Sequence, residues 1–188
     1  MFVTTATRYR RTDVVDRAIV LLGAVGLDGL SMRRLASDLG VQPSALYHHF
    51  AGKQELLGAV ADEILARGRR PNELVSWQAE LGLVCVELRD IMLEHRDGAA
   101  LVSMVRALGA GAEEPIRRMA GALAFAGADA ELARVGAHTL FHFVFGHVAD
   151  EQAHRAAAVA SGGVAPAGTD FAVGLGLILD GLGARLVS

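Results

Sequence analysis

Apolar residues recur at intervals of three and four along almost the whole chain, and this spacing constrains the fold more than any other feature. Apolar and polar residues do not alternate between hairpin turns anywhere in the sequence, so no β-strand is predicted. The chain has 188 residues, of which 52% are hydrophobic, and it can therefore bury a substantial core. We predict an all-α protein.

Capping signals place two short helices close together in the N-terminal third. Ser31 is a good N-cap for a helix over Met32–Leu39, and Gly40 can close that helix in a left-handed conformation. Pro43 suits the first turn of a second short helix, Ser44–Phe50, because backbone N–H groups in a first turn have no helical partner. Two short helices joined by a tight turn predict a helix-turn-helix.

Longer helices flank this motif. Thr12 is the expected N-cap of the first, which should end at Gly26, and another helix is expected over Gln54–Arg67. Further helices are predicted at about 76–95, 98–109, 113–126, 129–160 and 169–186. The sequence thus predicts a three-helix N-terminal domain, a connecting helix and a helical bundle.

Charge is unevenly distributed along the chain. The formal net charge is −3, but residues 1–70 carry a net charge of +3 and the remaining residues carry −6. A basic N-terminal module on an acidic body is typical of a DNA-binding head attached to a domain that does not contact phosphates.

Other protein classes are disfavoured. The longest stretches without a charged residue, Val135–Ala149 and Ala156–Thr169, are too short to span a bilayer, and no signal-peptide pattern is present. We therefore expect a cytoplasmic protein without membrane contact. The single cysteine, Cys85, excludes an intramolecular disulfide. Without a nucleophile elbow, Walker loop, dinucleotide fingerprint or zinc-protease motif, we expect no enzymatic activity and no cofactor.

The segment Leu30–Leu57 resembles the helix-turn-helix of the TetR family of transcriptional regulators. The matching features are the start LSMRRLASDLGV, the recognition-helix sequence LYHHF, and the later pairs GK and LL. The resemblance implies that the second helix of the motif enters the major groove, while neighbouring helices hold the DNA backbone. It assigns residues 8–57 to a DNA-binding domain, with 54–67 as the connecting helix.

Side chains in this motif have the chemistry that DNA contacts require. Arg33 can reach a guanine with its planar fork, although a phosphate contact would also suit it. His48 and His49 can donate to phosphates or form a solvated pair, and at least one is expected at DNA because both cannot face the core of a seven-residue helix. Residues expected to contact double-stranded operator DNA are Arg33, Pro43, Ser44, Ala45, Tyr47, His48, His49 and Lys53. The arginines at 8, 10 and 11 form either a DNA-binding arm or a solvated tail.

The C-terminal part resembles the corresponding domain of the tetracycline-repressor subgroup. The matching features are SWQ at 76–78, HRDGA at 95–99, the histidine-rich run 142–154 and the final segment 171–182. The resemblance implies that residues 71–188 form a ligand-binding and dimerisation domain, and that the eighth and last helices pair in a homodimer. Expected interface residues are His154, Phe171, Leu175, Ile178 and Leu182. Small residues would let the helices approach closely, namely Gly174, Gly176, Gly181 and Gly183.

Departures from the tetracycline repressors predict the effector. Val84, Val102 and Val105 fall where those proteins hold the drug with polar side chains, so we expect a mostly apolar pocket and a small, largely apolar effector. His138 and His142 are the expected polar anchors. The predicted lining is Trp77, Val84, Leu88, Val102, Val105, His138, Phe141, His142 and Phe145.

Two alternatives stay open. His138 and His142 are four residues apart, as are His147 and Glu151, and both spacings are compatible with a divalent metal. A metal-dependent hydrolase would use His138, His142, His147 and Asp150. Two ligands on one helical face are a weak signal, so we expect structural histidines and no metal. The other alternative is a DNA-binding protein that responds to no ligand.

Overall fold

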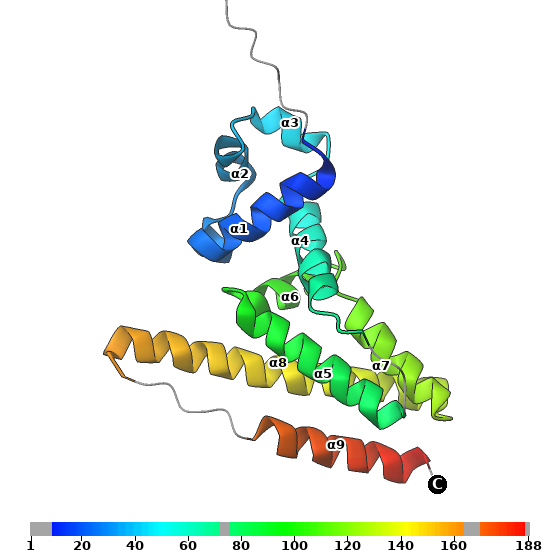
Figure 1. The fold of residues 1–188 in the computed structure, drawn as a ribbon. Coiled ribbons are helices and arrows are strands. Elements are labelled where there is room, and N and C mark those ends of the chain that lie inside the picture. The colour runs from blue at the N-terminus through cyan, green and yellow to red at the C-terminus, as the bar shows by residue number, and fades with distance from the viewer. Residues whose placement is uncertain (1–8, 72–75, 164–169, 187–188) are drawn as a thin grey trace, which may run out of the picture.

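The computed structural model describes residues 9–71, 76–163 and 170–186, so Arg8 lies outside the described residues. Within these ranges all regular secondary structure is helical, which confirms the predicted all-α fold (Figure 1). The helices are α1 (Arg11–Gly29), α2 (Met32–Asp38), α3 (Pro43–Tyr47), α4 (Lys53–Arg67), α5 (Trp77–Glu94), α6 (Gly98–Ala107), α7 (Glu114–Phe125), α8 (Ala130–Ser161) and α9 (Phe171–Leu186).

The start of α1 differs from the prediction. Its N-cap is Arg10 rather than Thr12, and the Arg10 backbone N–H donates to the Asp13 carboxylate at 2.7 Å. A carboxylate in the first turn accepts this bond and also complements the positive end of the helix dipole. The backbone leaves the helical conformation at Gly26 (φ 75°, ψ 176°), as the sequence predicted, and the last residues of α1 form a turn after this kink.

The helix-turn-helix forms largely from its own local signals. The Ser31 hydroxyl accepts the Arg34 backbone N–H at 3.2 Å, and Gly40 has a φ of 67°, so both predicted caps are confirmed. The second helix of the motif is shorter than predicted. Both His49 and Phe50 donate their backbone N–H to the Leu46 carbonyl, at 2.9 and 3.0 Å, and this turn ends α3 at Tyr47.

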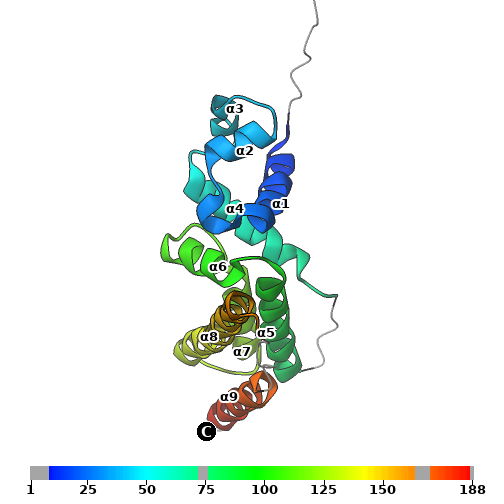
Figure 2. The ribbon, with the colours of Figure 1, turned by 90° about the vertical axis from the view of Figure 1, so that its left-hand side faces the viewer.

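The fold has two parts, which we name the head (residues 9–67, α1–α4) and the body (the described residues from 76 onward, α5–α9). Helix α4 runs from the helix-turn-helix to the body, and α8 crosses the body as its longest helix (Figure 1). Figure 2 shows the head and α9 at opposite ends of the molecule. Buried apolar side chains of both parts form one connected cluster. No helix of the described residues is long and apolar enough to cross a membrane.

Close packing between α8 and α9 depends on glycine. An added Cβ on Gly136 would lie 2.7 Å from Leu123 Cδ1 and 3.0 Å from Leu182 Cδ2. An added Cβ on Gly174 would lie 2.7 Å from the ring of Phe143. The sequence predicted Gly174 at an interface between protomers, but in the structure Gly174 packs against Phe143 of the same chain.

Candidate functional site

The predicted DNA-contacting side chains lie on and around α2 and α3. Arg33 is exposed and has no hydrogen-bond or ion-pair partner among the described residues, whereas Arg34 turns back to donate to the Gly29 carbonyl at 3.1 Å. Ser44 and His48 are also exposed, and Tyr47 is 54% exposed. The sequence prediction of the second motif helix placed both histidines on α3, but the structure places them in the turn that follows it.

The remaining predicted DNA contacts are half-buried, namely Pro43, Ala45, His49 and Lys53. Lys53 begins α4, and its ammonium donates to the Leu27 carbonyl at 3.4 Å. Lys53 is the first residue of α4, and the dipole of this helix attracts anions to the same N-terminus.

Ion pairs hold the head together around this surface. Glu55 accepts the Ala51 backbone N–H at 2.7 Å and pairs with Arg11 at 3.3 Å, and these two contacts lower the pKa of Glu55, the backbone bond more strongly. Arg17 of α1 donates two hydrogen bonds to the Asp38 carboxylate at the end of α2, and these bonds lower the pKa of Asp38. Arg11 is thus a structural residue of α1 and not part of an N-terminal arm.

The predicted ligand-binding residues divide by burial. Val84, Leu88, Val102, Val105 and Phe141 are buried, while the other predicted lining residues reach solvent. Trp77, His138 and Phe145 are half-buried, and His142 is exposed. Val84 and Leu88 line a cavity of about 10 Å³ between the end of α4, α5 and α7.

Charged residues that the sequence reasoning missed lie on the same cavity. Arg118 of α7 donates to Glu87 at 2.6 Å and to Glu80 at 2.9 Å. Burial opposes the charge of Arg118, but these hydrogen bonds outweigh it and raise the pKa of the guanidinium. The sequence contained a signal, because Glu80 and Glu87 share a helical face with Val84 and Leu88.

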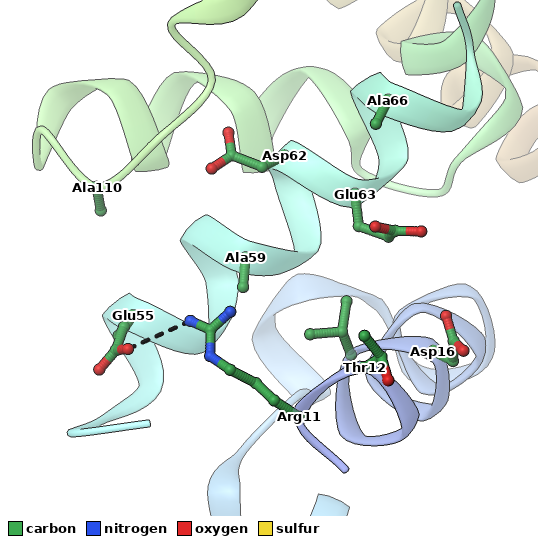
Figure 3. Close-up of a pocket in the computed structure, with 10 residues that line it drawn as sticks. Arg11, Thr12, Asp16, Glu55, Ala59, Asp62, Glu63, Ala66 and Ala110 are labelled. Carbon is green, nitrogen blue, oxygen red and sulfur yellow. Dashed lines mark hydrogen bonds and ion pairs between the residues drawn. The ribbon is translucent and has the colours of Figure 1, made fainter. Parts of the chain in front are cut away.

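Two clefts larger than this cavity lie where the head meets the body. A cleft of about 470 Å³ lies between α1 and α4. Figure 3 shows its lining residues, with Ala110 of the body at one side. A second cleft of about 520 Å³ lies between α4 and the loop from α6 to α7. Asp62 lines both clefts, and its carboxylate accepts the Ala112 backbone N–H at 2.7 Å. An added Cβ on Gly58 would collide with the Ala110 carbonyl oxygen.

The other end of α6 also contacts the head. The Asp97 carboxylate accepts the Leu27 backbone N–H at 2.8 Å, and it would lie 2.7 Å from an added Cβ on Gly26. Among the described residues, the non-glycine positions with positive φ are Asp97 (58°) and Ala112 (60°). Such conformations cost free energy and persist only where surrounding contacts impose them. Both flank α6, and both bond to the head.

The histidines of α8 do not assemble into a metal site. His138 and His142 have ring centroids 6.1 Å apart, whereas the His147 ring packs against Phe143 at 4.6 Å and Phe171 at 5.6 Å. Within the described ranges, no group of three or more His, Cys, Asp or Glu side chains could hold a metal ion. The residues of the hydrolase alternative are therefore not brought together.

The predicted dimer residues have different surroundings. Phe171, Leu175 and Leu182 are buried within the protomer, Ile178 is half-buried, and His154 is exposed beside the Asp150 carbonyl. The exposed apolar side chains of α9 are instead Val173 (66%) and Leu177 (71%). Gly176 and Gly181 have open space where a Cβ would stand.

Comparison with known proteins agrees with this architecture. The family model "Bacterial regulatory proteins, tetR family" matches residues 14–60, and "Tetracyclin repressor-like, C-terminal domain" matches residues 70–168. The class A tetracycline repressor protein from transposon 1721 of Escherichia coli is 35% identical over 201 residues, covering 95% of this chain and 93% of that protein.

Solved structures of similar proteins share this architecture. BioQ of Mycobacterium smegmatis has a TM-score of 0.84 at 40% identity, covering 94% of this chain and 98% of that chain. BioQ bound to its natural double-stranded DNA operator has a TM-score of 0.80 at 38% identity, covering 94% and 99%. These relatives are regulators rather than enzymes. The chain therefore belongs to the tetR family of bacterial regulatory proteins, as a DNA-binding transcriptional regulator with a tetracycline-repressor-like C-terminal domain.

Proposed function

We propose that the protein is a repressor that binds a near-palindromic operator as a homodimer and releases it when a small effector enters the body. DNA binding by BioQ and by the tetracycline repressors supports the first part. One helix-turn-helix offers few contacts, and twofold pairing doubles them. A protein with this role acts where the DNA is, which supports the predicted cytoplasmic location.

The main support for release by an effector is that both ends of α6 are attached to the head. Asp97 holds the end of α1, and Ala112 is held by Asp62 of α4. Because Val102 and Val105 of α6 are buried in the body, an effector that displaces them has to move α6. Movement of α6 would then pull on α4 and change the spacing of the two heads. The effect is limited to the effector's preference for one conformation, about 1–3 kcal/mol.

The test separates DNA binding from response to the effector. An operator is selected from random duplexes, and an effector is found by thermal-shift screening followed by operator release. Asp97→Ala and Asp62→Ala should keep operator affinity within a few-fold but lose most of the release by the effector. Asp129→Ala is the control, since Asp129 caps α8 by accepting the Leu132 N–H and does not contact the head. Normal release by both junction variants would contradict the coupling.

The homodimer is expected to use the exposed face of α9. Leu177→Glu should dissociate the dimer, because it places an unpaired charge in an apolar contact. Val20→Glu, at an exposed position of α1, should not. Leu175→Glu, on the face turned toward α8, should destabilise the protomer instead. Sedimentation at micromolar concentration measures both effects. A wild-type monomer, or a DNA footprint without twofold symmetry, would refute the dimer.

Regulation without a ligand is the second candidate. Val84 and Leu88, two of the predicted pocket residues, line a cavity of only about 10 Å³, which favours this candidate. If no compound changes operator affinity while the junction variants behave like wild type, this candidate replaces the first.

A further inference from the structure

The turn between α5 and α6 contacts the end of α1 through two side chains. The Asp97 Oδ2 atom accepts the Leu27 backbone N–H at 2.8 Å, and Arg96 Nη1 donates to the Ala24 carbonyl at 3.3 Å. Gly26, at the kink of α1, lies against both side chains, since an added Cβ would stand 2.7 Å from Asp97 Oδ2 and 3.2 Å from Arg96 Nε. The turn is thus packed closely on the head.

Asp97 makes this contact instead of capping its own helix. It is the N-cap residue of α6, where an aspartate side chain usually accepts a backbone N–H of the first turn. No such bond forms, and the carboxylate is bonded to Leu27 of the head instead. The first N–H groups of α6 therefore need an acceptor from elsewhere, since they have none within the helix.

Gln152 of α8 provides that acceptor. Its Oε1 accepts the Ala99 N–H in the first turn of α6 at 3.3 Å. Its Nε2 donates to the Met92 carbonyl in the last turn of α5 at 2.8 Å and to the His95 carbonyl at 3.2 Å. One side chain therefore bonds the end of α5, the turn and the start of α6 to α8.

These bonds lie on both sides of Asp97, whose backbone needs support. Asp97 has a φ of 58°, a left-handed conformation that costs free energy and persists only where surrounding contacts impose it. Gln152 bonds to His95, two residues before Asp97, and to Ala99, two residues after it. Loss of these bonds should free the Asp97 carboxylate to leave the head.

We propose that Gln152 is a positioning residue for operator binding, which fixes the head relative to the body by holding Asp97 against α1. None of the bonds that Gln152 makes with described residues reaches the head, so it acts through Asp97. This inference rests on the proposed homodimer on a near-palindromic operator. Because the body is expected to form the dimer, fixing each head to its body fixes the distance between the two heads. The homodimer should therefore prefer one spacing between the half-sites.

Operators with altered spacing test this role. One inserted or deleted base pair shifts a half-site by about 3.4 Å and turns it by about 35°. The wild-type protein should lose about tenfold or more in affinity on both operators, as it would for a mismatched base pair. Gln152→Met keeps the length of the side chain but removes its three hydrogen bonds, so this loss should fall below about threefold. Affinity for the selected operator should stay within a few-fold. Fluorescence anisotropy measures both.

Gln78→Met is the matched control. Gln78 lies on α5, is exposed and makes no side-chain hydrogen bond with any described residue, so this variant should keep the wild-type spacing preference. A wild-type preference in Gln152→Met, or a wild-type protein that is indifferent to spacing, would overturn the proposal. A twofold DNA footprint would in either case leave the proposed function standing.

Amide exchange separates positioning from a general loss of stability, and it needs no DNA. The Leu27 N–H, which donates to Asp97, should exchange about tenfold or more faster in Gln152→Met than in the wild-type protein. The Leu35 N–H donates to the Ser31 carbonyl at 2.9 Å within the head, and its exchange should not change. Equal acceleration of both amides, or of neither, would refute the positioning role.

A double variant tests the route through Asp97. Gln152→Met combined with Asp97→Ala should relax the spacing preference no more than Asp97→Ala alone, since both act on the same contact. Additive relaxation would reveal another route and contradict the assignment. If circular dichroism shows that Gln152→Met does not fold, Gln152→Ala replaces it, because alanine gives up the same three bonds.

Discussion

Two arginines, one in the head and one in the body, have opposite surroundings. In the head, Arg33 is exposed and makes no ion pair with any described residue. In the body, Arg118 is nearly buried and donates from all its nitrogens to Glu80 and Glu87. An exposed cation without an ion-pair partner costs little free energy, because water screens its charge. A buried cation has to be neutralised by the fold itself.

This difference indicates how each part recognises its partner. Arg33 of the head can gain a phosphate or base contact without losing a bond to any described residue. In the body, Arg118 could bind an added anion only by giving up a contact with Glu80 or Glu87. Recognition in the body should therefore be coupled to a change in structure, and recognition in the head need not be.

Removing the buried cation should give the largest effect. Arg118→Leu leaves Glu87 and Glu80 without their guanidinium and should reduce the free energy of unfolding by about 3–5 kcal/mol. Arg67→Leu removes an exposed cation that pairs with Glu63 and Asp16, and it should cost less than about 1 kcal/mol. Urea denaturation measures both. Equal losses would show that burial does not distinguish the two charges.

Arg33 and Lys53 of the head should differ from each other on DNA. Arg33→Ala should cost about 1–3 kcal/mol on the preferred operator and leave nonspecific affinity nearly unchanged. Lys53→Ala should weaken binding to all duplexes and reduce the salt dependence by about one unit, since Lys53 begins α4 and is predicted to contact phosphate. Binding is measured by fluorescence anisotropy at several salt concentrations. Similar losses for Arg33→Ala on operator and random DNA would make it a phosphate contact.

Acid should have the smallest effect, and in the head Glu55 contributes to it. The Ala51 N–H and Arg11 lower the pKa of Glu55 in the folded state, so its contribution is complete above the pKa of the unfolded chain and lost as pH falls through the folded value. The thermal unfolding midpoint should therefore fall in this acidic range, and Glu55→Gln should make that fall shallower. Because the group is exposed to solvent, the change should be modest. A variant with the wild-type profile would show that other carboxylates dominate.

Local signals in the sequence were sufficient for most of the fold. Ser31, Gly40 and Pro43 each act through their own backbone or a neighbour within a few residues, and the structure places all three as predicted. The prediction of Thr12 as a cap was wrong because Asp13 accepts the Arg10 N–H and starts the helix earlier. Both possible starts of α1 depend on nearby residues, and the prediction was wrong only about which of them begins the helix.

Tertiary structure decided the contacts that couple the two parts. Asp97 meets Leu27 across 70 positions, and Arg118 meets Glu87 across 31. Periodicity shows that a residue lies on a given face of a helix, but not which distant helix covers that face. The apolar prediction for the pocket therefore included Val84 and Leu88 but missed the charges opposite them. The sequence determined the helices, their order and the DNA-facing motif because short-range hydrogen bonds and side-chain spacing specify them, whereas the pairing of buried charges depended on how the helices pack.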